Sequence, residues 1–198
     1  MFFIGIQTNN CCSIFVNDRS ISMSNFDAVP TMEELPNNRV GALYEACYKF
    51  LQKRQAMNDI ASCIMYNSNS TVLFESQKVC PTLVTSYMAS VGADGGTSFV
   101  NAIAALKPIV DKNDDSKYVP LAIFMSDGEC QDNGSTALLK SIVASHPEFK
   151  LSAVGLGKSD HGVLKDFASI GKGIFVKSDI NIDSLVSAYE KILPGFKK

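Results

Sequence analysis

The sequence predicts an α/β fold in which a doubly wound, mostly parallel six-stranded sheet carries helices on both faces. One observation behind this prediction is that strand-like and helix-like segments alternate almost from end to end. A second is that most strand-like segments are nearly unbroken apolar runs, as expected for strands covered on both sides. A third is the three-residue turn 67–69, which permits only antiparallel pairing and therefore predicts one antiparallel edge strand.

The first half of the chain alternates between strands and one long helix. An apolar run at 11–16 predicts a buried strand that leads into a polar loop. A helix is expected over about 39–54, since its apolar residues recur at helical spacing, followed by a strand over 60–66 and an edge strand that includes 71–74. The apolar positions of that helix are Val40, Leu43, Tyr44, Cys47 and Leu51.

The second half repeats the alternation. A short helix within 81–90 and a Gly-rich loop over 92–96 precede a helix that Ser98 can cap and that carries Phe99 to Val110. Further strands are expected over 118–126, 151–156 and 174–176, and further helices over about 135–145, 163–170 and 185–193. We expect one domain over 1–198, with its core at about 11–193; whether residues 1–10 extend the first strand stays open.

Composition excludes several classes of function. The net charge of −2 and the pI near 5.7 argue against a nucleic-acid footprint, which needs a basic face. No apolar stretch approaches the ~20 residues of a membrane span, and the first apolar run is too short for a signal peptide. We therefore expect a cytoplasmic protein, in which the six cysteines serve packing rather than disulfides.

Oxygen-bearing side chains follow the ends of the predicted strands. Asp18, Ser20 and Ser22 follow the first strand, Thr97 follows two glycines, and Asp127 follows the strand over 118–126. In parallel sheets, ligands bind beyond the carboxyl ends of strands, at the point where the crossovers diverge. If the first strand and the 118–126 strand are neighbours there, these oxygens converge on one crevice. An all-oxygen set without Cys or His suits a hard cation such as Mg²⁺.

The two carboxylates determine what such a site would do. At ~5 Å apart they repel by roughly 3 kcal/mol at an effective dielectric near 20, and a divalent cation between them reverses that penalty. We therefore expect Asp127→Ala to cost no stability in chelator. Because Mg²⁺ seldom takes all its oxygens from the protein, the site has room for a ligand from a partner, for which an Asp or Glu carboxylate is the natural group.

At these residues the chain resembles the von Willebrand factor A domain family, over about residues 11–193. Asp18, Ser20 and Ser22 match its D-x-S-x-S motif, Thr97 its separate threonine and Asp127 its later aspartate. The resemblance implies a Rossmann-like sheet, Mg²⁺ or Mn²⁺ bound at a metal-ion-dependent adhesion site, and protein–protein adhesion or assembly rather than catalysis, as in intracellular members. The rim of the site would then comprise Arg19, Gly95, Gly96, Ser98, Gly128 and Glu129.

Two departures from the family pattern and two rival functions remain. Asn17 replaces an apolar residue and Ile21 replaces a frequent glycine, but neither change removes a ligand oxygen. One rival is a metal-independent scaffold of the same family within an intracellular complex. The other is a serine hydrolase that uses Ser20 or Ser22, although neither lies in a Gly-x-Ser-x-Gly elbow and the only candidate bases are His146 and His161.

Overall fold

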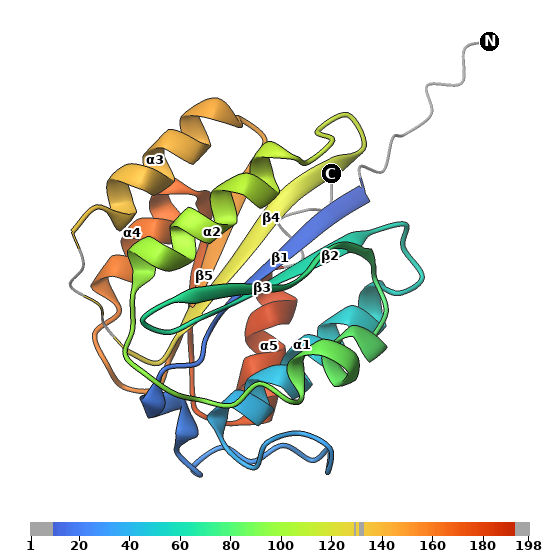
Figure 1. Cartoon of the computed structure of the whole chain (residues 1–198), viewed down its shortest axis with the longest axis vertical. Coiled ribbons are helices and arrows are strands. Elements are labelled where there is room, and N and C mark those ends of the chain that lie inside the picture. Colours follow the sequence, from blue (N-terminus) through green and yellow to red (C-terminus); the bar gives the residue numbers. More distant parts are fainter. Residues whose placement is uncertain (1–9, 129, 131–132, 193–198) are drawn as a thin grey trace.

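A computed structural model describes residues 10–128, 130 and 133–192. These residues form one six-stranded sheet in the order β3-β2-β1-β4-β5-β6, with helices before and after its strands (Figure 1). The strands are β1 (Asn10–Asp18), β2 (Ile60–Tyr66), β3 (Ser70–Lys78), β4 (Tyr118–Ser126), β5 (Lys150–Leu156) and β6 (Lys172–Ser178). The helices are η1 (Ile21–Ser24), α1 (Arg39–Arg54), η2 (Val84–Met88), α2 (Phe99–Asp111), α3 (Ser135–Ser145), α4 (Gly162–Ile170) and α5 (Ile182–Ile192).

The sheet is doubly wound about its two central strands, β1 and β4. These strands pair in parallel, and only β3, at one edge, runs antiparallel to its neighbour. The chain leaves β1 through α1 to reach β2 on one side, and it enters β4 from α2 on the other. The crossovers therefore diverge between the carboxyl ends of β1 and β4, which is where ligands bind in such sheets.

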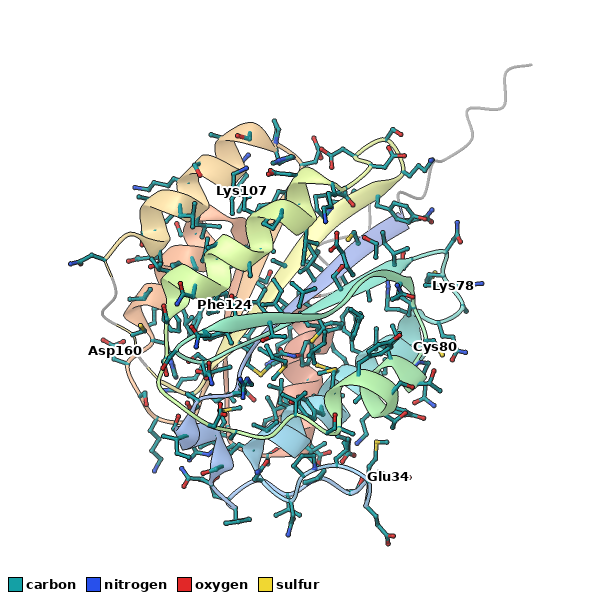
Figure 2. All side chains as sticks on the ribbon, viewed as in Figure 1. Glu34, Lys78, Cys80, Lys107, Phe124 and Asp160 are labelled. Carbon is teal, nitrogen blue, oxygen red and sulfur yellow. The ribbon has the colours of Figure 1, made fainter. Side chains whose placement is uncertain are left out.

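Helices cover both faces of the sheet. In Figure 1, α1 and α5 lie together on one face, while α2, α3 and α4 lie on the other. Each layer encloses its own apolar core, and Figure 2 shows side chains filling the space between helices and sheet, with Phe124 of β4 among them. In the described residues, no helix combines the length and the apolar character needed to cross a bilayer.

The predicted fold class is confirmed, and most predicted elements lie at or within two residues of their expected bounds. The helix over 39–54 and the strands over 60–66 and 118–126 match α1, β2 and β4. Three strands extend at least two residues beyond the predicted apolar run, because β1 spans 10–18, β3 continues to Lys78 and β6 spans 172–178. The added residues are mostly polar, so pairing extends beyond the apolar run that identified each strand. Leu193, the last residue assigned to the final helix, lies outside the described residues.

Candidate functional site

Parallel pairing brings the ends of β1 and β4 to the same edge of the sheet. Asn17 pairs with Met125 in register, so the last residues of the two strands, Asp18 and Ser126, lie side by side at this edge of the sheet. The segments that follow β1 and β4 lie together at the lower left of Figure 1. The condition on which the predicted site depended, that these two strands are neighbours, is therefore met.

Asp18 is fully buried and is held by two hydrogen bonds. The backbone N–H of Ser20 donates to its Oδ1 at 2.7 Å, and the hydroxyl of Ser126 donates to its Oδ2 at 2.6 Å. Burial disfavours the charged form and raises the pKa of Asp18 to about 6, against the lowering effect of these donors. A positive charge beside Asp18 would remove much of that cost.

The hydroxyls of the D-x-S-x-S motif connect the first strand to Asp127. The oxygens of Ser20 and Ser22 lie 3.1 Å apart, and the hydroxyl of Ser22 donates to Asp127 Oδ1 at 2.7 Å. Ser20 and Asp127 are buried, whereas Ser22 is exposed. The structure thus brings together, at one edge of the sheet and open to solvent on the side of Ser22, two carboxylates and two hydroxyls of the predicted set.

Thr97 is held at this edge by its backbone neighbours. The carbonyl of Gly95 accepts from Ile21 N at 3.0 Å, which joins the Gly-rich loop to the segment after β1. The carbonyl of Thr97 itself accepts from Cys130 Sγ at 3.1 Å, on the segment that follows β4. Thr97 therefore lies between the two strand-end segments that carry the other predicted ligands.

The predicted rim residues have more varied surroundings. Gly95 adopts a positive φ of 68°, a conformation that side chains disfavour, and the N–H of Gly96 donates to Ser68 Oγ at 2.9 Å. Ser98 caps α2 as expected, and Gly128 N donates to Ser126 Oγ at 3.2 Å. Glu129 lies outside the described residues.

Arg19 is hydrogen-bonded to the Gly-rich loop and stabilises it. Its guanidinium bonds Asp94 at 2.5 Å and the carbonyl of Gly92 at 3.3 Å, while its own carbonyl accepts from Asp94 N. These contacts tie the residue next to Asp18 to the loop that positions Thr97.

Sequence reasoning missed three residues at this site: Ser126, Arg39 and Asp27. Ser126 could have been found, because it directly precedes Asp127 at a strand end. Arg39 donates from Nη1 to Asp127 Oδ2 at 2.6 Å and forms two further bonds with Asp27. The expectation that Asp127→Ala costs no stability in chelator considered only repulsion between carboxylates, and the structure adds a cationic partner of Asp127 whose loss acts against it.

The donor set fits a small hard cation. A chain of hydrogen bonds runs from Asp18 through Ser20, whose backbone N–H it accepts, to the hydroxyl of Ser22 and on to Asp127, with Thr97 on the adjoining loop. Over the described ranges, no cluster of three or more Cys, His, Asp or Glu side chains could hold a metal. A site of two carboxylates and several hydroxyls is not a cluster of that kind, and its oxygens are those that Mg²⁺ prefers.

Several solved structures share this architecture at low sequence identity. The conserved hypothetical protein BatB from Bacteroides thetaiotaomicron is 17% identical, with a TM-score of 0.72 over 94% of this chain and 98% of that one. The SpRpn10 VWA domain is 11% identical, with a TM-score of 0.71 over 96% and 98%. Proximal thread matrix protein 1 from the mussel byssus, described with a zinc-occupied MIDAS motif, is 16% identical, with a TM-score of 0.72 over 93% and 45%.

No curated protein was found that matches the chain. The sequence model of the von Willebrand factor type A domain family matches residues 68–176, which is more than half of the 198 residues. This match runs from the turn before β3 through β6 and includes Thr97 and Asp127. The chain belongs to the von Willebrand factor type A domain family.

Proposed function

We propose that this protein is a metal-dependent interaction module that binds a carboxylate of a partner protein. Asp18, Ser20, Ser22, Thr97 and Asp127 would hold Mg²⁺ or Mn²⁺, and an Asp or Glu side chain of the partner would complete the shell. The observation that carries the proposal is the hydrogen-bonded set that joins Asp18, through Ser20 and Ser22, to Asp127 at the ends of β1 and β4. A bound cation would attract the partner carboxylate and orient it.

Burial makes a bound cation energetically reasonable at this site. Asp18 and Asp127 are both buried, and two anions at such positions are costly unless positive charge balances them. Ser20 and Ser22 supply neutral oxygens that add ligands without adding negative charge. The zinc-occupied motif described for the structurally similar mussel protein supports a divalent cation within this fold.

Binding rather than catalysis is part of this proposal. The hydroxyl of Ser22 donates to Asp127, whose other oxygen is held by Arg39, and His146 pairs with Asp111 at the far end of α2. His161 precedes α4 without a side-chain capping bond, and neither of its ring nitrogens has a hydrogen-bond partner within the part of the chain that the structure covers. These contacts favour a site that coordinates over one that transfers protons.

A cytoplasmic location is the setting that we propose for this module. None of the six cysteines, all of which lie within the described residues, forms a disulfide, and only Cys80 among them is not buried. The pKa of the Cys47 thiol is raised to about 12 by burial, as expected of a residue that serves packing. Such cysteine usage is typical of reducing compartments.

A metal-independent scaffold is the second candidate, and Arg39 favours it. Its guanidinium already gives Asp127 a positive partner at 2.6 Å, so the edge of the sheet is partly charge-balanced by the protein alone. In this alternative, the same surface would recognise its partner without a cation.

Thermal unfolding with added Mn²⁺ distinguishes the two candidates. A cation that binds only the folded state stabilises it by mass action, by about 2.7 kcal/mol at a hundredfold excess over its Kd. We expect Mn²⁺ to raise the Tm of the wild type and of the control Asp160→Ala, whose carboxylate is exposed on the loop before α4 (Figure 2). Asp127→Ala should lose this increase. An equal increase in all three proteins would contradict the site assignment.

Partner binding is tested by affinity capture in Mg²⁺ and in chelator. We expect proteins that are retained by the wild type in Mg²⁺ to be lost both in chelator and with Asp127→Ala. Retention of the same proteins under all conditions would support the metal-independent scaffold.

A further inference from the structure

The guanidinium of Arg39 connects two carboxylates, one inside the candidate metal site and one outside it. Its Nε and Nη2 donate to the two oxygens of Asp27, each at 2.6 Å, in the bidentate geometry that suits arginine. Its remaining nitrogen, Nη1, donates to Asp127 Oδ2 at 2.6 Å and approaches the carbonyl of Ser22 at 3.4 Å. A proposed metal ligand therefore shares one of its oxygens with a cation that the protein supplies.

The position of Arg39 in the fold indicates that these carboxylates hold it in place. It is the first residue of α1, where the partial positive charge of the helix terminus disfavours a cation. No acidic residue lies in the first turn of α1 to offset this, and only 14% of the Arg39 side chain is exposed. Its stabilising partners are Asp27 and Asp127, which come from the loop before α1 and from the end of β4.

Charge makes Arg39 a competitor of a divalent cation. Asp127 has both oxygens engaged, Oδ1 by Ser22 and Oδ2 by Arg39, and only 1% of its side chain is exposed. A cation that binds Oδ2 takes the place of Nη1, and one that binds Oδ1 lies close to the positive charge of Arg39 in a poorly solvated setting. Arg39 would thus lower the affinity of the site for a metal ion.

Asp27 affects how easily the guanidinium of Arg39 releases Asp127. The side chain of Asp27 is 50% exposed, and its bidentate pair uses Nε and Nη2 but not Nη1, so this pair can be kept if Nη1 leaves Asp127. Without the carboxylate of Asp27, Arg39 would depend on Asp127 alone and would release it less readily. Removal of Arg39 and removal of the Asp27 charge should therefore change metal affinity in opposite directions.

We propose that Arg39, retained by Asp27, is a built-in counter-cation that competes with the divalent ion for Asp127 and so sets the metal affinity of the site. This inference rests on the proposed function, because it requires that a cation binds at Asp127. It goes further in that it assigns a regulating role to two residues outside the proposed ligand set.

Calorimetric titration of the whole chain with Mn²⁺ alone tests this role. We expect Arg39→Met, which keeps an unbranched apolar stem, to lower the Kd for Mn²⁺ at least about tenfold, or 1.4 kcal/mol. Asp27→Asn, at an exposed position, should raise the Kd several-fold. The matched control is Arg54→Met, since Arg54 also bonds a buried aspartate, Asp59, but at the opposite end of the sheet. Its Kd should equal that of the wild type.

A second readout separates this role from ordinary loss of stability. In chelator, we expect both Arg39→Met and Arg54→Met to lower the Tm, because each leaves a buried carboxylate without its partner. Saturating Mn²⁺ should then raise the Tm of Arg39→Met more than that of the wild type, and should raise that of Arg54→Met by the wild-type amount.

The possible outcomes distinguish the inference from the proposed function. If the wild type binds Mn²⁺ while Arg39→Met binds it equally or more weakly, the inference is overturned and the metal site stands. Binding by Arg39→Met alone would support the inference in its strongest form. If no variant binds Mn²⁺, both the metal-dependent function and the role of Arg39 are overturned.

Discussion

At Asp18, burial and hydrogen bonding act in opposite directions on the charge of one carboxyl group. Burial raises its pKa, and the donors Ser126 and Ser20 lower it, with burial as the larger effect. The hydroxyl of Ser126 fixes Oδ2 while Ser20 N fixes Oδ1, so the orientation of the carboxylate is determined by its neighbours. Ser126 therefore acts as a positioning residue for the proposed cation.

Replacement of Ser126 by alanine tests this positioning role. A hydrogen bond to a buried charged group contributes about 1.5–3 kcal/mol, so Ser126→Ala should lower the free energy of unfolding by that amount. It should also weaken Mn²⁺ binding in calorimetry. Ser152→Ala is the matched control, because Ser152 is likewise buried in a central region of the sheet and accepts from Ile174 N. Weakened Mn²⁺ binding in both variants would show that Ser126 has no specific role.

The residues of the candidate site differ in how far the sequence could predict them. Asp18 and Asp127 each follow an apolar run, so the pattern placed them at strand ends before any pairing was known. Arg39 could not be found in this way, because its partner Asp127 lies 88 residues further along the chain. The one sequence signal of the role of Arg39 is its position at the start of a predicted helix, because a cation there needs an anionic partner.

Among the elements, the segment between η1 and α1 depends on one buried acid of α1. Glu45 accepts from Thr31 N at 2.5 Å and from Thr31 Oγ1 at 2.7 Å, and it pairs with Lys49 at 2.8 Å. This segment carries Asp27, so Glu45 also fixes the loop that presents a partner to Arg39. Burial alone would raise the pKa of Glu45, but the hydrogen bonds from Lys49 and Thr31 outweigh it, and the pKa lies below its ordinary value.

The lowered pKa of Glu45 predicts a pH-dependent contribution to stability. A carboxyl whose pKa is lower in the folded state stabilises the fold above its ordinary pKa of 4.5, and this contribution is lost as the pH falls through the folded pKa. We expect urea unfolding to show Glu45→Gln less stable than the wild type at pH 7, with the difference shrinking below pH 4.5. Glu34→Gln, in the same loop but exposed (Figure 2), is the control. A gap between wild type and Glu45→Gln that stayed constant across this range would contradict the assigned role.

Elements were predictable where both faces of the sheet are covered, and less so elsewhere. The apolar runs of β2 and β4 match their bounds because burial on both faces leaves few polar positions. The second half of β3 is hard to recognise in the sequence because most of its residues are exposed. Ser76 also has a positive φ, near a shift in register. The pairing of β3 with β2 nevertheless continues to Lys78, which only the tertiary structure reveals.

In the molecule as a whole, an aromatic cluster supports the strand end that carries Asp127. Phe124 of β4 contacts the rings of Phe99 in α2, Phe167 in α4 and Tyr66 in β2, at centroid distances of 5.3, 5.2 and 5.2 Å. The hydroxyl of Tyr66 also donates to the carbonyl of Met125 at 2.9 Å. The cluster thus joins the sheet to the helical layer of α2 and α4, next to the strand end that carries Asp127.

Because this cluster joins helices to the sheet, Phe124→Ala should destabilise the whole fold. Loss of a buried phenylalanine costs about 3–5 kcal/mol, so we expect the urea midpoint to fall with an unchanged m-value, since the same surface unfolds cooperatively. Phe26→Ala removes the same group from a side chain that is 75% exposed and should change the free energy of unfolding by no more than about 0.5 kcal/mol. A cost below about 1 kcal/mol for Phe124→Ala would contradict the close packing of the cluster. A reduced m-value would instead show that the layers unfold separately, and the site at the ends of β1 and β4 would then depend on only part of the fold.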